Sequence, residues 1–74
     1  MVIATLVSRA IAGRIPSCEI AGEHTFEDLD IDNLDRICIA NEVEEHFHVE
    51  LSDDAVAAWD SVADVMLSVE QARA

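Results

Sequence analysis

The chain has 74 residues, 51% of them hydrophobic, and its 16 acidic side chains against four basic ones give a formal net charge of −12. This length predicts one domain, residues 1–74, with enough apolar side chains for a small core that needs no metal or disulfide. The charge excludes nucleic acid as a partner, because phosphates are neutralised by a basic surface, and it favours a basic patch on another protein.

Cysteine content and the N-terminal segment indicate where the protein works. Cys18 and Cys38 could form at most one bridge, which is sparse for a secreted disulfide scaffold. The apolar run Met1–Val7 has no basic segment ahead of it and is too short to cross a membrane. We expect a cytoplasmic monomer with free thiols and no membrane partner.

The first half of the chain predicts one helix followed by a long loop. Apolar residues at positions 2, 3, 6, 7, 10 and 11 have the spacing of an amphipathic helix, which we expect from Val2 to about Arg14. Gly13 and Pro16 would end it. Residues 17–32 lack a helical period and are predicted to form a long connection, attached to the core by its large apolar side chains, Ile20, Phe26, Leu29 and Ile31.

A second helix is predicted from about Asn33 to Phe47, with Asp32 or Asn33 as its N-cap. Its outer side would be acidic. Its buried stripe is expected to consist of apolar residues at helical spacing, namely Leu34, Ile37, Ala40 or Asn41, Val43 or Glu44, and Phe47.

The last part of the chain predicts two more helices. Ser52 is expected to cap a short third helix that ends near Ala58. Ser61 and Asp64 resemble a capping box, with Asp in place of Glu, and would open a fourth helix. Trp59 is interpreted as a core residue between these two helices. The sequence therefore predicts an all-α fold of four helices, in which the last one keeps the helical period at Val62, Val65, Met66 and Val69.

Four aspartates fall within the eight residues from Asp28 to Asp35, and such carboxylates repel one another. Because folding alone gives no reason for this cluster, we expect a positively charged partner. An EF-hand calcium loop is rejected, since its twelfth position is Ile39 rather than a bidentate Glu. His46 and His48 do not share a helix face, so no specific metal site is predicted, only weak nonspecific binding of divalent ions.

The sequence contains no arrangement that predicts an enzyme. His24 has no identifiable catalytic partner, and Cys38 is interpreted as an inert thiol. No Ser-His-Asp order, glycine-rich phosphate loop or carboxylate pair in an expected cleft stands out. We therefore expect a binding role rather than a catalytic one.

The order and spacing of these segments resemble acyl carrier proteins and the related peptidyl carrier domains. The matching residues are Phe26-x-Asp28-Leu29-x-x-Asp32-Asn33-Leu34-Asp35, Glu44-Glu45-His46-Phe47, Glu50-Leu51-x-Asp53 and Ser61-Val62. The resemblance implies an acyl-carrier-like four-helix bundle with a long first loop and a short third helix. It also implies a carrier of acyl thioesters on 4′-phosphopantetheine, as used in fatty acid biosynthesis and in polyketide or nonribosomal peptide synthesis.

The cofactor-binding position of this family is occupied here by Asn33, where the family's Asp-Ser-Leu motif has its attachment serine. Attachment requires a hydroxyl oxygen that attacks phosphorus, whereas the lone pair of an amide nitrogen is delocalised into its carbonyl. We expect 4′-phosphopantetheine only if position 33 is serine. Two versions remain open: a carrier whose attachment serine has been replaced, or a divergent homologue that cannot be pantetheinylated at this position.

Four neighbouring residues also depart from the family pattern. Asp30 stands where the family usually has glycine, and Cys38 where it frequently has an acidic residue. Asn41 replaces a frequent Met, and Arg36 adds a positive charge to the second helix. These changes suggest different partners or a relaxed requirement for the usual ones.

We expect the acidic second helix to dock onto basic patches of partner proteins. By resemblance these are a phosphopantetheinyl transferase, acyl or aminoacyl ligases and synthase enzymes. Exposed ion pairs contribute at most about 1 kcal/mol each, so the affinity would be modest and salt-sensitive. The alternative is a small acidic interaction or divalent-metal-buffering protein unrelated to acyl transfer. The expected partner-binding residues are Asp30, Asp32, Leu34, Asp35, Glu44 and Glu45.

Overall fold

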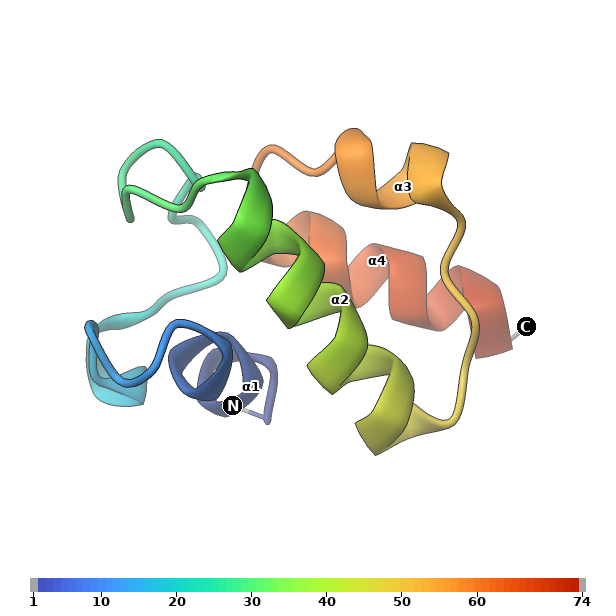
Figure 1. Ribbon diagram of the computed structural model, residues 1–74, viewed down its shortest axis with the longest axis horizontal. Helices are drawn as coiled ribbons and strands as arrows, with labels where there is room; N and C mark the ends of the chain where they lie inside the picture. The colour runs from blue at the N-terminus through green and yellow to red at the C-terminus, as the bar shows by residue number, and fades with distance from the viewer. Residues whose placement is uncertain (1, 74) are drawn as a thin grey trace.

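Four α-helices form the fold in the computed structural model, which describes residues 2–73 (Figure 1). They are α1 (Val2–Ala10), α2 (Asn33–Phe47), α3 (Asp53–Ala57) and α4 (Val62–Arg73). Within the described residues there is no β-strand, and Thr25 and Ser61 form an isolated antiparallel bridge. The predicted all-α architecture with a short third helix is therefore confirmed. No helix in residues 2–73 has the length and apolar character needed to cross a membrane.

Helix α1 ends at Ala10, so the prediction that it runs to about Arg14 was wrong. The amide of Ala12 donates to the carbonyl of Arg9 (3.1 Å) and that of Gly13 to the carbonyl of Ser8 (2.8 Å). These two bonds are the Schellman pattern that ends many helices, with Ala12 in the left-handed position at φ 58°. The chain therefore leaves the helix before Gly13 rather than at it.

The long loop between α1 and α2 is fastened to the start of α4. It contains one short 3-10 helix, η1 (Ser17–Glu19). The amide of Phe26 donates to the carbonyl of Asp60 (2.9 Å), and the amide of Val62 donates to the carbonyl of His24 (3.0 Å). The predicted anchors of this loop are confirmed, because three are buried and one packs against the core: Ile20, Phe26 and Leu29, and Ile31.

The core lies where α1, α2 and α4 meet. Their buried side chains are Ile3, Ala4, Leu6 and Val7 from α1, Ile39, Ala40 and Val43 from α2, and Val62, Val65 and Val69 from α4. Trp59 is buried in the core, as predicted. Its Nε1–H donates to Ser68 Oγ on α4 (2.8 Å), and its ring packs edge-on against the ring of Phe26, with 6.1 Å between the ring centroids.

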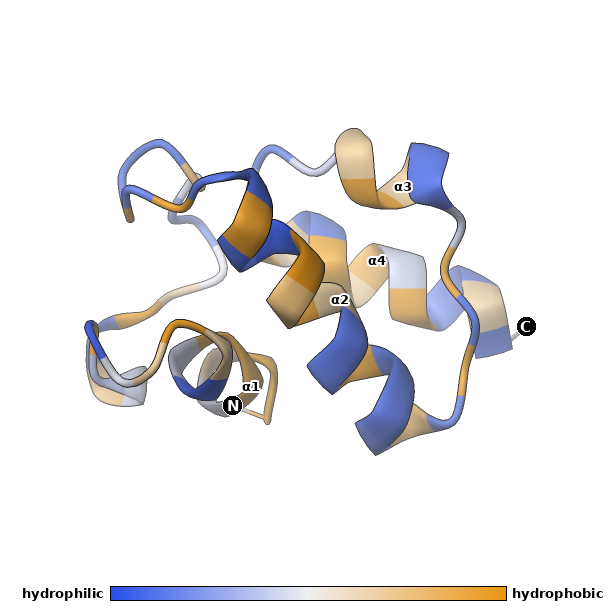
Figure 2. Cartoon of the chain, in the orientation of Figure 1, coloured by the Kyte–Doolittle hydropathy of each residue, from blue (hydrophilic) through white to orange (hydrophobic). Residues whose placement is uncertain are grey.

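The predicted buried stripe of α2 was partly wrong. Leu34 and Ile37 are exposed rather than buried. The row that faces the core is instead continued toward the N-terminus by Arg36, four residues before buried Ala40. A charged residue in the core-facing row made the buried stripe difficult to recognise. The apolar bands in the first turns of α2 (Figure 2) therefore include residues that are exposed, Leu34 and Ile37.

Candidate docking site at the start of α2

The acidic stretch before α2 has a structural role, of which the sequence indicated only the helix cap. Asp32 is the N-cap of α2, and its Oδ1 accepts the amide hydrogen of Asp35 at 2.8 Å. Asp35 Oδ2 accepts the amide hydrogen of Asp32 in return, at 3.4 Å. This capping box satisfies two backbone donors at a helix end where four would otherwise lack partners. Carboxylates near this end also interact favourably with the helix dipole.

Asp28 makes a similar reciprocal pair with Thr25 one turn earlier. Its Oδ2 accepts the amide hydrogen of Thr25 at 3.3 Å, and its own amide donates to Thr25 Oγ1 at 3.0 Å. Three of the four aspartates in the stretch thus accept backbone hydrogen bonds. The expectation that folding gives no reason for the cluster was therefore wrong.

Arg14 gives the cluster a positive partner from within the chain. Its guanidinium forms an ion pair with Asp35, which lies 21 residues further along. The hydrogen bond to Asp35 raises the pKa of Arg14 above its usual value, and the electrostatic attraction of Asp35, Asp32 and Asp30 adds to this effect. Part of the charge that was expected to await a partner is therefore balanced internally.

Asp30 is exposed, and its backbone has an unusual conformation. Its φ is 57°, in the left-handed region that favours glycine. This conformation gives a physical reason for the glycine that the resembling carriers usually have at this place. Aspartate tolerates it better than most residues do.

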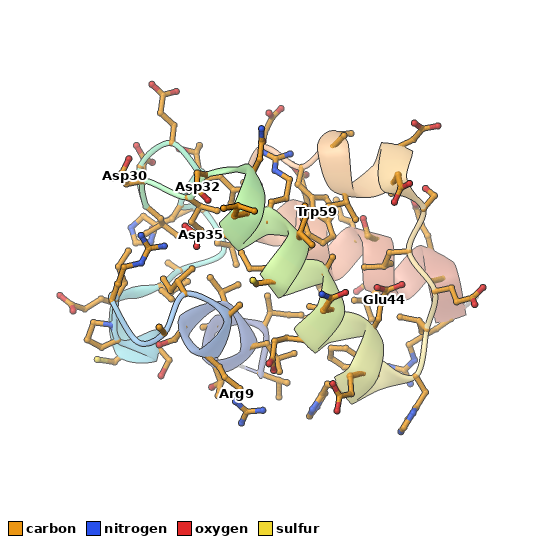
Figure 3. All side chains as sticks on the ribbon, viewed as in Figure 1. Arg9, Asp30, Asp32, Asp35, Glu44 and Trp59 are labelled. Carbon is orange, nitrogen blue, oxygen red and sulfur yellow. The ribbon has the colours of Figure 1, made fainter. Side chains whose placement is uncertain are left out.

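The expected partner-binding residues do not all lie together (Figure 3). Asp30, Asp32 and Asp35 gather at the start of α2, whereas Glu44 lies further along it. Glu44 is half-buried, and its Oε2 accepts the amide hydrogen of Leu51 at 2.9 Å, which fastens the link after α2.

Leu34 and Glu45 are both exposed on α2. They share one face of the helix, because eleven residues correspond to about three turns. Leu34 therefore joins the acidic groups at the start of α2, while Glu45 extends the same face toward its end.

Asn33 is the first residue of α2, and it is exposed. It follows the cap rather than forming it, so Asp32 is the N-cap of the two residues predicted for that role. Its carboxamide offers an amide nitrogen and a carbonyl oxygen but no hydroxyl. The residue at this position therefore does not fit a phosphopantetheine phosphodiester.

A groove of about 520 Å³ runs between α2 and α3 and begins beside Asn33. Its walls include Ile37 and Ala40 on α2, Val56 on α3, and Leu51 from the link between the two helices. In the part of the chain that the structure describes, no three His, Cys, Asp or Glu side chains are placed to share a metal ion. The site thus consists of an acidic helix start, an exposed leucine and an adjoining groove.

Two arginines near this site have roles that sequence reasoning missed. No local pattern links Arg14 to Asp35 across 21 residues. Arg36 was noted only as a positive charge, although its Nη1 donates to carbonyl oxygens of α3. Its spacing from Ala40, Val43 and Phe47 was the available signal, because four residues at this spacing share a helix face.

Comparisons with known proteins agree with this geometry. The family model described as "Phosphopantetheine attachment site" matches residues 2–67. The chain is also 32% identical over 53 residues to a protein of Mycoplasmopsis pulmonis (strain UAB CTIP) named "Acyl carrier protein homolog". That match covers 72% of this chain and 73% of the relative. The chain therefore belongs to the carrier-protein family defined by a phosphopantetheine attachment site.

Proposed function

We propose that the chain docks the start of α2 onto enzymes that transfer acyl or aminoacyl groups, without carrying phosphopantetheine at position 33. The observation that carries this proposal is Leu34, which is 73% exposed beside the acidic cap of α2 in a carrier-family chain. A large apolar side chain surrounded by carboxylates suits a partner with an apolar pocket rimmed by basic residues.

The exposed residues of α2 indicate how the free energy of docking would be divided. Leu34 and Ile37 are 73% and 54% exposed, and they lie one turn apart. Complete burial of one such side chain contributes about 1.5–3 kcal/mol. Each ion pair at the rim contributes at most about 1 kcal/mol, so the charges mainly speed the encounter and select the partner.

Asn33 leaves two versions of this function. In the first, the chain is a carrier whose attachment serine has been replaced, and a serine at position 33 restores the attachment site. In the second, it is a divergent homologue that acts as a docking adaptor, a regulator or a decoy for carrier-binding enzymes. Both versions rely on the same docking surface.

The first experiment incubates the chain and an Asn33→Ser variant with coenzyme A and a phosphopantetheinyl transferase. Intact-mass spectrometry should show the added phosphopantetheine on the variant alone, because only serine provides the attacking oxygen. A mass gain on the unsubstituted chain would show that the argument about Asn33 is wrong. No gain on either chain would contradict docking to the transferase.

The second experiment tests the docking surface in the Asn33→Ser background. Leu34→Ala should lower the modification rate at low carrier concentration about tenfold, since a buried leucine contributes about 1.5–3 kcal/mol. Leu67→Ala is the matched control, because Leu67 lies on α4 and is 53% exposed. Equal rates in the two variants would refute the assignment of Leu34 to the docking surface.

A further inference from the structure

Arg36 connects α2 to the C-terminal end of α3. Its Nη1 donates to the carbonyl oxygen of Val56 at 2.9 Å and to that of Ala57 at 2.8 Å. Its Cζ lies 5.1 Å from the centroid of the Phe26 ring, within cation–π range. The guanidinium therefore binds two carbonyls at the end of α3, of which that of Val56 also accepts the amide hydrogen of Trp59 at 3.3 Å, and its charge complements the dipole of α3.

Helix α3 has few other attachments. It has five residues, none of them buried, and Val56 packs against the core only in part. An isolated helix of this length is unstable in water, because nucleation costs more than so few hydrogen bonds return. The bonds from Arg36 consequently help to hold α3 in place, together with the Ser52 cap and the packing of Val56.

Arg36 also borders two cavities. One is the groove between α2 and α3 that begins beside Asn33. The other has a volume of about 530 Å³ and is lined by Phe26 and Trp59 together with three carboxylates, those of Glu27, Asp30 and Asp60. The side chain of Arg36 thus forms a wall common to both.

The observed position of Arg36 leaves one donor unsatisfied. Its Nε is buried and has no hydrogen-bond partner. A buried donor without an acceptor is costly, above all in a charged group. The position that holds α3 is therefore less favourable than its two hydrogen bonds suggest, and the carboxylates lining the second cavity offer the same guanidinium other acceptors.

We propose that Arg36 is a two-position latch for α3. In the closed position it binds the carbonyls of Val56 and Ala57 and holds α3 beside the groove. In the open position the guanidinium turns to the carboxylates of the second cavity, α3 is released, and the groove next to position 33 widens. Both positions give the guanidinium hydrogen-bond acceptors, so a small difference in free energy decides between them.

Amide hydrogen exchange, measured by NMR on the full chain, tests the closed position. The reporters are the amides of Val56 and Ala58, which donate to Ser52 and Asp54 across α3. Arg36→Met should make them exchange about tenfold faster and leave α4 amides unchanged, because it removes two charge-assisted hydrogen bonds. Arg9→Met is the control. It also removes one positive charge and a contact to α2, the 3.5 Å ion pair between Arg9 and Glu42, but this contact does not involve α3.

Two results with Arg36→Met would overturn the latch. One is unchanged exchange of the α3 amides, and the other is an equal acceleration of all amides, which would mean global destabilisation. A triple variant, Glu27→Gln with Asp30→Asn and Asp60→Asn, tests the open position without altering the core, because all three side chains are exposed. It should slow exchange of the α3 amides about two- to fivefold. Exchange that is unchanged or faster would refute the open position.

Discussion

Replacing Ala12 with glycine should stabilise the protein. Ala12 is exposed and has φ 58° in the Schellman motif that ends α1. For a residue with a Cβ atom this left-handed conformation costs roughly 1–2 kcal/mol. Glycine removes that cost but loses roughly 0.5–1 kcal/mol more backbone entropy on folding. From the midpoints of these two ranges, the net gain for Ala12→Gly is about 0.7 kcal/mol, which raises the melting temperature by about 4–5 °C in a domain of this size.

Thermal and urea unfolding followed by circular dichroism measure this gain, and the dependence on urea should keep its slope. Ala63→Gly provides a control of opposite sign. Ala63 is also exposed but lies inside α4, where glycine should cost about 0.5–1 kcal/mol. If Ala12→Gly destabilises the protein as much as Ala63→Gly does, the reasoning about backbone strain fails.

Substitutions at three further positions test contacts around the site and in the core. Asp32→Ala should cost about 1 kcal/mol in urea unfolding, because the amide of Asp35 loses its acceptor, whereas Asp32→Asn should retain most of the stability. Arg14→Gln should lower the melting temperature at low salt and less so in high salt, because the Arg14–Asp35 pair is exposed. Asp35 raises the pKa of Arg14, so the stability that this group contributes is fully present below the usual arginine pKa and is lost only above the raised pKa. The loss of melting temperature caused by Arg14→Gln should therefore be equal at about pH 7 and about pH 10. Ser68→Ala should cost about 1 kcal/mol in thermal unfolding, since it removes the acceptor of Trp59 Nε1–H, and no measurable change would argue against that bond.

The bounds of α2 could be predicted from the sequence because its signals are local. Asp32 and Asp35 form a capping box at the expected place, and Phe47 is the last residue of the helix as predicted. The face of α2 was harder to predict. Arg36 lies in the core-facing row although it is charged, and Leu34 lies on the outer face although it is apolar. A pattern based on hydrophobicity therefore assigns both residues to the wrong face.

The residues of the candidate site could be proposed from the sequence, but their contacts could not be predicted. The sequence shows Asp30 as a charged residue, but its positive φ belongs to the path of the folded loop and has no sequence signal of its own. The pairing of Arg14 with Asp35 joins segments that only the folded loop brings together. Such contacts have no periodicity, so a sequence pattern cannot indicate them.

The placement of Asn33 has a consequence for how the family evolves. The hydrogen bonds that begin α2 are made by Asp32 and Asp35, on either side of position 33, and the residue at that position is exposed. An exchange between asparagine and serine there should leave the stability of the fold almost unchanged. The two amino acids have codons that differ by a single nucleotide. One point mutation can therefore remove or restore the hydroxyl, and selection for folding would not oppose it in either direction.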